Sequence, residues 1–305
     1  FTMYTQPLSS LIKTLKHSYH FFADDSQLYD STVPADTPSL ACEMSSSIAS
    51  VADWMHENKL KMNDEKTEVI AIGTRTKLAQ TPLLSMTISG HEIELSHSVR
   101  NLGAYLDETL SMDTQINILC RALNFHLRRI GKIRQYLSAQ SANTLAVSFI
   151  LSRLDFCNSL LSGLPDAKLS RLQRIQNNAA RVVLRQPRRA SATSALRTLH
   201  WLPVKARIDY KLACLTFHCL HSDSCPSYLS ELISPYKPTR TLRSQDASLL
   251  TVPRYSLKTS GKRAFSVTAP TLWNSLPSSL RHTDTFPTFK KNLKTYLFCM
   301  YLTAD

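Results

Sequence analysis

The spacing of apolar residues after about position 113 constrains the fold more than any other feature of this sequence. One stripe there steps by three and four positions and contains Ile116, Leu119, Leu123, Leu127, Ile130, Ile133 and Leu137. Such steps place side chains on one face of an α-helix. Further helices are predicted for residues 141–163, 165–184, 203–221 and 287–301, with Gly163 as a left-handed C-terminal cap. The second part of the chain is therefore predicted to be mainly helical.

Residues 1–112 show a different pattern, in which short strands alternate with helices. A short helix is predicted first, followed by two strands around the aspartate pair of HFFADDSQLY. Apolar residues at positions 40, 44, 48, 51, 54 and 55 then predict a helix. We predict a buried strand for residues 66–73, two or three short strands for residues 83–107 with a turn at Ser89 and Gly90, and short strands near residues 249–253. The fold class is therefore expected to be α+β.

The charged residues divide the chain into segments of opposite sign. Residues 1–120 contain 8 Lys/Arg and 15 Asp/Glu, whereas residues 121–208 contain 16 Lys/Arg and 2 Asp/Glu. Residues 209–305 contain 12 and 6, and the whole chain has a net charge of +13. An acidic segment joined to a strongly basic one suggests metal chemistry beside a surface that binds a polyanion. A basic protein without a nucleic-acid partner is the alternative.

Cysteine usage and hydropathy indicate the compartment. The chain has seven cysteines at irregular spacings, which do not resemble a disulfide framework and favour a reducing, intracellular location. No signal peptide and no apolar run of about 20 residues is visible, so we expect neither secretion nor a membrane partner. The group Cys214, His218, Cys219, His221 and Cys225 matches no reliable zinc pattern. We expect a packed helix face there and no zinc.

Asp24 and Asp25 are candidate metal ligands. At the tip of a β-hairpin both carboxylates can be exposed while Tyr19, Phe21 and Leu28 are buried on the sheet. Adjacent carboxylates at a partly enclosed tip repel each other, and their hard oxygen atoms suit Mg²⁺. For the pair taken by itself, an ordinary acidic turn is the alternative.

The motifs that follow the aspartate pair occur in a specific order. The box FADD, at residues 22–25, precedes VADWMHENKLKMNDEKTEVIAIG and VRNLGAYLD, and then SRLDFCNSLLSGLP, LQRIQNNAARVVL, LHWLPVKARIDYKL, RAFSVTAPTLWNSLP and FKKNLKTYLF. In this order, and over nearly its whole length, the chain resembles the C-terminal part of a non-LTR (LINE-type) retrotransposon reverse transcriptase. The palm motif after FADD is matched by Trp54, Asn58, Leu60, Asn63, Lys66, Thr67 and Glu68.

The resemblance implies RNA-directed DNA polymerisation by a two-metal mechanism. Asp24 and Asp25 would hold Mg²⁺, and Lys66 would protonate the departing pyrophosphate, with a solvated turn lysine as the alternative. Leu102 and Gly103 correspond to the primer-grip hairpin. The implied partners are an RNA template, an RNA–DNA duplex and deoxynucleoside triphosphates. The implied location is a ribonucleoprotein in the cytoplasm and nucleus.

The resemblance also implies three regions. Residues 1–112 correspond to a palm remnant, residues 113–186 to a basic helical thumb, and residues 187–305 to a helical and mixed C-terminal domain. In the family a further palm aspartate and a Gln-Gly motif precede the position of Phe1, so we expect no Mg²⁺-dependent primer extension from this polypeptide alone. The tripeptide LDF at residues 154–156 resembles the missing aspartate motif but lies in a predicted helix, and is rejected. An inactive nucleic-acid-binding remnant is the alternative to a polymerase fragment.

Two of the predicted helices carry basic residues on one side. In and just after residues 165–184, arginines recur at intervals of three, seven and four positions as Arg171, Arg174, Arg181 and Arg185. The helix that follows position 113 adds Arg121, Arg128 and Lys132. Cationic side chains in such an arrangement suit contacts with the phosphates of a duplex. A solvated helix face is the alternative, although such a face usually interleaves both signs of charge.

Overall fold

The computed structural model describes residues 2–83, 85–88, 90–237, 248–257 and 259–303. These residues form a mixed α+β structure that is mostly helical, with its strands in antiparallel pairs.

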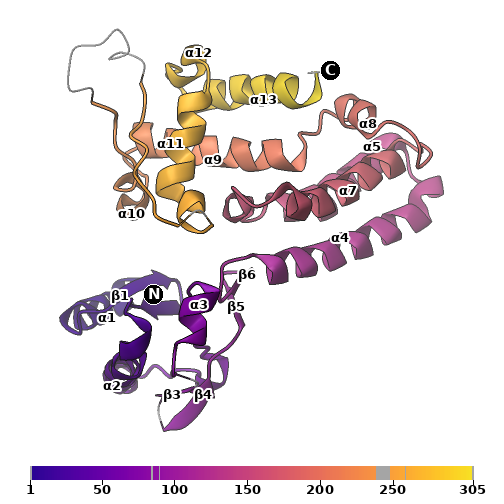
Figure 1. The fold of residues 1–305 in the computed structure, drawn as a ribbon. Helices are drawn as coiled ribbons and strands as arrows, with labels where there is room; N and C mark the ends of the chain where they lie inside the picture. The colour runs from indigo at the N-terminus through magenta and orange to yellow at the C-terminus, as the bar shows by residue number, and fades with distance from the viewer. Residues whose placement is uncertain (1, 84, 89, 238–247, 258, 304–305) are drawn as a thin grey trace. The chain divides into compact units, whose positions relative to one another are not determined.

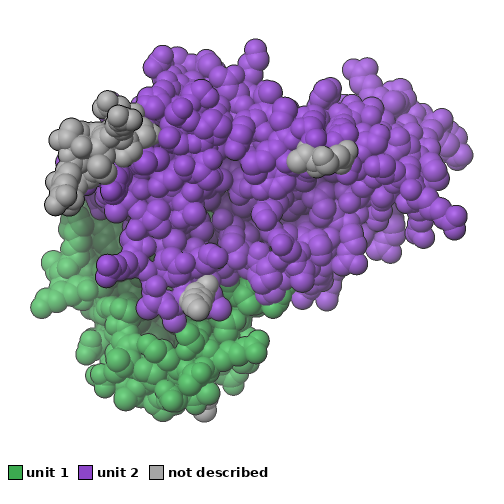
Figure 2. All heavy atoms as spheres, turned by 45° about the horizontal axis from the view of Figure 1, so that its top comes forward, with its two compact units in different colours: residues 1–115 green, residues 116–305 purple. Residues whose placement is uncertain are grey.

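The chain divides into two compact units, residues 1–115 and residues 116–305, which are green and purple in Figure 2. Every paired strand of the described residues lies in the first unit. Nearly all of the predicted thumb, residues 113–186, and all of the predicted C-terminal region, residues 187–305, belong to the second unit.

The first unit begins with two helices and a hairpin that share one core. α1 (Thr2–Thr14) leads into the antiparallel strands β1 (Ser18–Phe22) and β2 (Asp25–Tyr29), and α2 (Thr37–Glu57) follows. Their buried core consists of Leu8, Ile12 and Val51, with partly buried Leu11, Leu15, Tyr19, Phe21, Leu28, Trp54 and Met55 around it. The predictions of the leading helix, the two strands and the following helix are confirmed.

Two further hairpins follow, where the sequence predicts two or three strands. The strands are β3 (Ser85–Ile88), β4 (His91–Glu94), β5 (Ser98–Asn101) and β6 (Ala104–Asp107). β3 pairs with β4 and β5 pairs with β6. Gly90 has a positive φ of 82° in the first turn, as a tight hairpin favours. Ser89, the other predicted turn residue, lies outside the described residues.

The buried strand predicted for residues 66–73 does not form. Residues Asp64–Lys66 form a 3₁₀ turn, and Val69 makes only an isolated bridge to Leu95. Ile72 is 51% exposed, and the short helix α3 (Arg75–Ala79) begins soon after it. A buried strand needs hydrogen-bonded neighbours along its length. Within the described residues, the main chain of this run bonds to other segments at Val69, which accepts from Ser96, and at Gly73, which donates to Glu108. The prediction is wrong because these two separated hydrogen bonds do not form a continuous strand pairing.

The second unit contains the long helix predicted from the apolar stripe. α4 (Asp113–Ile133) buries Ile116, Leu119, Leu123 and Ile130, which confirms the helix and the first part of its apolar stripe. The end of the predicted stripe is wrong, because Ile133 is 45% exposed and the helix ends there, before Leu137, whose backbone is extended. The helix predicted for residues 165–184 is also confirmed. It is α7 (Asp166–Val183).

The helix predicted for residues 141–163 is shorter and irregular. α5 (Ala139–Ala146) continues through a π-helical turn, Val147–Leu151, into α6 (Ser152–Asp155). Phe156 then has an extended backbone, which ends the helix. The periodicity of apolar residues predicts neither the π turn nor this early end.

Gly163 has the predicted left-handed conformation, with a φ of 68°, but it follows a 3₁₀ turn and does not cap a helix. A Cβ atom at this position would lie 2.8 Å from Cγ of Arg263. Arg263 donates hydrogen bonds to the carbonyl oxygens of Ser162, at 3.2 Å, and of Leu160, at 3.1 Å. Glycine is therefore required here by both the backbone conformation and the close approach of Arg263.

The remaining helices form the C-terminal part of the second unit. They are α8 (Ala192–Thr198), α9 (Val204–His221), α10 (Ser227–Ser230), α11 (Phe265–Ser275), α12 (Ser278–Arg281) and α13 (Phe286–Leu302). α9 and α13 confirm two predicted helices and run side by side, with α11 crossing them (Figure 1). The strands predicted near residues 249–253 reduce to one bridge between Pro235 and Leu250. No helix of the described residues is long and apolar enough to cross a bilayer.

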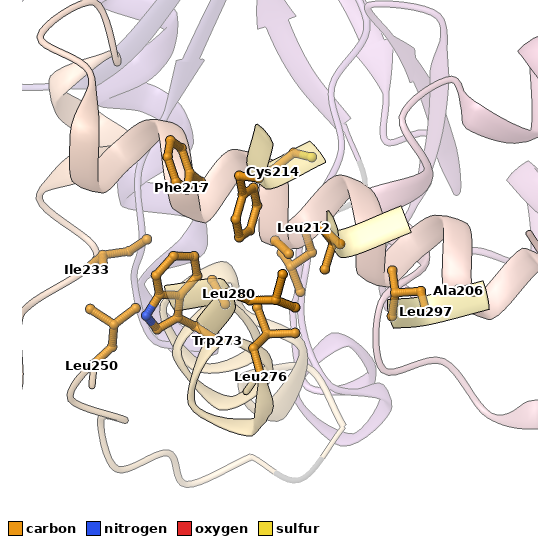
Figure 3. Close-up of a cluster of buried hydrophobic side chains, with 14 of the residues drawn as sticks. Ala206, Leu212, Cys214, Phe217, Ile233, Leu250, Trp273, Leu276, Leu280 and Leu297 are labelled. Atoms are coloured by element: carbon orange, nitrogen blue, oxygen red, sulfur yellow. The ribbon is translucent and has the colours of Figure 1, made fainter. Parts of the chain in front are cut away.

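The helices α9, α11 and α13 enclose a core centred on Trp273, shown in Figure 3. The Trp273 side chain is fully buried, and its Nε1 donates a hydrogen bond to the carbonyl oxygen of Ser248 at 2.9 Å. The rings of Phe217 and Phe289 stack beside it with their centroids 4.5 Å apart. We name this group of buried side chains the Trp273 core.

Side-chain amides fasten α7 to the start of α9. Gln176 is fully buried and donates from Nε2 to the carbonyl oxygen of Leu202 at 2.8 Å. Gln173 Oε1 accepts a hydrogen bond from the backbone N–H of Val204, also at 2.8 Å. Buried polar groups with good partners fix one arrangement of neighbouring elements.

Candidate nucleic-acid interface

The aspartate pair lies at the tip of the β1–β2 hairpin. Phe22 pairs with Asp25, so that Ala23 and Asp24 form the turn between the strands. Both carboxylates are exposed. The tip is therefore open, whereas the sequence suggested a partly enclosed one. A cation can reach both side chains together with the phosphates of a ligand.

The turn holds Ala23 in a backbone conformation that favours glycine, with a φ of 54°. In this region the Cβ atom crowds the backbone carbonyl oxygen. We expect Ala23→Gly to raise the free energy of unfolding of the first unit by about 1 kcal/mol, measured by denaturant titration. The matched control is Ala52→Gly inside α2, which should lower it by roughly 0.5–1 kcal/mol. A destabilised Ala23→Gly variant would contradict this account of the turn.

A second hairpin of this unit is hydrogen-bonded to the first. Leu102 and Gly103 have φ values of 45° and 85° and form the turn between β5 and β6. The side chain of Gln27, on β2, donates a hydrogen bond from Nε2 to Oδ1 of Asn101 at 2.7 Å. The structure thus joins the hairpin of the aspartates to the hairpin of the predicted primer grip.

Lys66 lies in the exposed 3₁₀ turn after α2. Among the described residues, no hydrogen bond or ion pair joins Lys66 to Asp24 or Asp25. The structure therefore brings together the two hairpins but shows no direct contact between the lysine and the aspartates.

A buried histidine at the base of the aspartate hairpin escaped the sequence analysis. Nδ1 of His17 lies 3.1 Å from Oδ2 of Asp30, and its Nε2 lies 2.9 Å from the hydroxyl of Ser47 on α2. The backbone N–H of Ser31, and secondly His17, hold the pKa of Asp30 below its usual value. These contacts fasten the hairpin to α2. A lone histidine in the sequence carries no signal that would reveal them.

The oxygen atoms at the hairpin tip suit Mg²⁺ as part of a site. Mg²⁺ is commonly held by one or two carboxylates together with phosphates and water, and Asp24 and Asp25 can supply the carboxylates. Within the described ranges, no group of three or more His, Cys, Asp or Glu side chains could hold a metal. Bound there, Mg²⁺ would offset the negative charge of a nucleotide's phosphates.

Helices α4 and α7 enclose a groove of about 470 Å³. It is lined by Asn117, Cys120, Arg121, Asn124, Arg128 and Arg171, and an adjoining hollow adds Arg174 and Ile175. We name these two hollows the α4–α7 groove. The structure thus brings together four of the arginines predicted to bind nucleic acid, Arg121 and Arg128 from α4 and Arg171 and Arg174 from α7.

The α4–α7 groove is cationic. In the part of the chain that the structure describes, none of its four arginines forms an ion pair with a carboxylate. Arg171 donates a hydrogen bond to Oδ1 of Asn117 at 2.7 Å, which holds its guanidinium at the groove. Burial raises the pKa of the Cys120 thiol, and the positive charges of Arg171 and Arg174 oppose that rise. The cationic groups can therefore accept an anionic ligand without first breaking salt bridges.

Three other predicted residues lie elsewhere. Arg181 donates to the carbonyl oxygen of Ala190 at 3.0 Å and to Oδ1 of Asn178 at 3.1 Å. Arg185 donates to the carbonyl oxygens of Arg134, Gln135 and Leu137 at 3.2, 3.0 and 3.5 Å. Lys132 is exposed near the end of α4 and is not among the groove-lining residues. Arg181 and Arg185 thus close loops by binding main-chain oxygens, a role that helical spacing alone does not reveal.

Arg134 is a buried cation that the sequence analysis did not single out. Its guanidinium donates to the carbonyl oxygens of Val182, Val183 and Leu137 at 2.7–3.2 Å. Burial, and secondly the charge of Arg185, lower its pKa, yet an arginine stays charged at neutral pH. Carbonyl groups in the last turn of a helix carry partial negative charge. Arg134 donates to two of them at the end of α7, of which that of Val182 also accepts the backbone N–H of Arg185 at 3.2 Å.

Loss of this cap should destabilise the second unit. We expect Arg134→Ala to lower its free energy of unfolding by about 3 kcal/mol, because buried carbonyl groups would lose a charged donor. Denaturant titration measures the change. The exposed Arg189 provides the control, since Arg189→Ala should change stability by less than about 0.5 kcal/mol. Equal effects of the two substitutions would refute the capping role.

The cysteine and histidine group of α9 has a packing role. Cys214 and Phe217 belong to the Trp273 core, as their helical spacing predicts. Burial raises the pKa of Cys214 to about 11 and that of Cys219 to about 12. Cys219 and Cys225 are free thiols with their Sγ atoms 3.2 Å apart.

Asp155, from the rejected LDF tripeptide, lies in α6, as the sequence predicts. It accepts a hydrogen bond from Nη1 of Arg207 at 2.7 Å, across to α9. This aspartate therefore joins two helices of the second unit.

Comparisons with protein-family models, curated proteins and solved structures found no match to this chain. The two joined hairpins and the α4–α7 groove are therefore the observations on which a function can be argued.

Proposed function

We propose that this chain is part of a retrotransposon reverse transcriptase and that its α4–α7 groove binds an RNA–DNA duplex. The observation that carries the proposal is the groove itself, in which two helices present arginines that form no ion pairs with carboxylates of the described residues. The chain segment at residues 114–154, which includes α4 after its first residue, contains no Asp or Glu.

The spacing of the arginines fits a polyanion. Arg121 and Arg128 are seven residues apart on α4, which corresponds to about 10 Å along a helix. A duplex carries one negative charge per about 1.7 Å of its axis, counted over both strands, so about six phosphate charges, roughly three on each strand, lie along such a length. Guanidinium groups bind phosphate oxygens through two parallel hydrogen bonds. Arg171 and Arg174 would extend these contacts across the groove.

The first unit would supply the polymerase palm in the parent enzyme. Asp24 and Asp25 would hold Mg²⁺ together with the triphosphate of the incoming nucleotide, and Leu102 and Gly103 would contact the primer. The hydrogen bond from Gln27 to Asn101 supports this proposal, because it joins the two hairpins.

A salt titration tests the binding function. Fluorescence anisotropy would follow binding of the 305-residue protein to a labelled 20-base-pair RNA–DNA hybrid at several salt concentrations. With four phosphate contacts, the logarithm of the affinity should fall with the logarithm of the salt concentration with a slope of about −3.6. Absence of binding at low salt, or a slope near zero, would overturn the proposal.

A further inference from the structure

A cluster of aromatic rings and arginines lies on α4 and the π-helical turn. The rings of His126 and Phe149 are stacked, with centroids 5.2 Å apart and planes at 17°, and Phe125 meets His126 edge-on at 5.3 Å. The guanidinium carbon of Arg129 lies 4.6 Å from the centroid of Phe125, and that of Arg153 lies 5.8 Å from the centroid of Phe149. We name these five residues the aromatic–arginine cluster.

The cluster is accessible, although its rings are large and apolar. The side chains of Phe125 and Phe149 are 47% and 40% exposed. Neither residue belongs to the buried core of the unit, because α4 buries Ile116, Leu119, Leu123 and Ile130 instead. Exposed phenylalanines that lie together are uncommon on a protein surface and mark binding sites. The cluster is therefore a candidate binding surface.

The cluster adjoins the α4–α7 groove but consists of different residues. The groove is lined by Arg121, Asn124 and Arg128 of α4, and none of the five cluster residues lines it. On a helix with 100° per residue, Phe125 lies about 40° from Arg121 and about 60° from Arg128, whereas Arg129 lies further round, about 80° and about 100° from them. The second unit thus offers two neighbouring cationic surfaces with separate residues.

The chemistry of the cluster suits unpaired nucleotides. Nucleobases that are not in a duplex stack on aromatic rings and on guanidinium planes, and arginines add attraction to the phosphates. Burial, then the charges of Arg153 and Arg129, lower the pKa of His126, which favours the neutral form of its ring. The chain has no acidic residue between Asp113 and Asp155 that could repel phosphates. A π-helical turn, which often marks a functional site, contains Phe149.

We propose that the aromatic–arginine cluster is a binding site for single-stranded nucleic acid, which stacks its bases on Phe125, Phe149 and the guanidinium groups of Arg129 and Arg153. This activity goes beyond duplex binding in the groove and does not depend on it. The recognised chemistry is a flexible strand with exposed base faces and phosphates, which RNA and DNA share.

The test separates base stacking from phosphate attraction. Fluorescence anisotropy would measure binding of the full chain to three labelled probes: a 12-nucleotide oligo-dT, a 12-nucleotide oligo-rU, and an abasic strand of the same length, which has the phosphates but no bases. We expect the wild-type protein to bind both base-containing strands at least tenfold more tightly than the abasic strand. A preference for rU over dT would assign the site to RNA, and the reverse preference to DNA.

Paired variants locate the site. Phe125→Leu with Phe149→Leu retains apolar bulk and should weaken oligo-dT and oligo-rU binding by roughly tenfold or more, with little effect on the abasic strand. Phe125→Tyr with Phe149→Tyr retains the rings and should preserve binding. Tyr255→Leu removes an aromatic ring that is 43% exposed and outside the cluster, and should have no effect. RNA–DNA hybrid binding by the leucine variant should stay at the wild-type level, which separates this site from the groove.

Two results would overturn the proposal. Equal affinity of the wild-type protein for base-containing and abasic strands would show that no stacking occurs. The second result would be that the wild-type protein sediments as a dimer and the leucine variant as a monomer, while both bind the strands equally well. That result would assign the exposed rings to a contact between protein copies.

Discussion

Neutralising the four arginines of the α4–α7 groove should weaken RNA–DNA duplex binding by about a thousandfold at 0.1 M salt. The variant combines glutamine substitutions of Arg121, Arg128, Arg171 and Arg174. Each lost phosphate contact removes the entropy gained when a counterion leaves the duplex. The slope of the logarithm of the affinity against the logarithm of the salt concentration should therefore become less negative by about 3.6.

The control removes the same charge from exposed positions away from the groove lining. It combines glutamine substitutions of Arg188, Arg189, Lys291 and Lys294, all of which are exposed. A fall in affinity as large as that of the groove variant would show that net charge, and not the groove, governs binding. Arg181 and Arg185 are left intact in both variants because they bind main-chain oxygens, and their loss would confuse binding with stability.

Truncation of Trp273 should have the largest effect on stability. We expect Trp273→Ala to lower the free energy of unfolding of the second unit by about 4 kcal/mol, because it leaves a cavity in a fully buried core. The hydrogen bond to the carbonyl oxygen of Ser248 is lost as well. Denaturant titration followed by circular dichroism measures the change. A loss below about 1 kcal/mol would mean that the Trp273 core does not hold α9, α11 and α13 together.

The less severe substitution Trp273→Phe provides the comparison. It keeps an aromatic ring in the core and should cost roughly 2 kcal/mol, from reduced packing and the unpaired carbonyl group. If both substitutions had the same effect, the hydrogen bond rather than the volume of the ring would dominate.

Periodicity predicted the elements whose partners are close in the sequence or whose apolar face is continuous. The helices α4, α7, α9 and α13 have such faces, and the β1–β2 hairpin has a tight turn between short strands. The prediction of a strand at residues 66–73 was wrong because a strand depends on hydrogen-bond partners from distant segments. Periodicity does not specify those partners. The sequence did not predict the π turn that contains Phe149. Such a turn depends on local packing, which periodicity does not specify either.

The candidate site was predictable in its residue types but not in its geometry. Arg121, Arg128, Arg171 and Arg174 were recognisable as basic helix faces, and the structure places them around one groove. Arg181 and Arg185 continue the same spacing, yet Arg181 binds the carbonyl oxygen of Ala190, and Arg185, which lies just after α7, binds those of Arg134, Gln135 and Leu137. Which arginine lines the groove and which binds the main chain is decided by tertiary contacts. The buried Arg134 shows the same effect.

The amide contacts of Gln173 and Gln176 have a consequence for genetics. They attach α7, one wall of the groove, to the residues that lead into α9, and α9 is part of the Trp273 core. A screen for lost nucleic-acid binding would therefore recover two classes of allele. One class would alter groove arginines, and the other would alter apolar residues of the C-terminal helices that never touch the ligand.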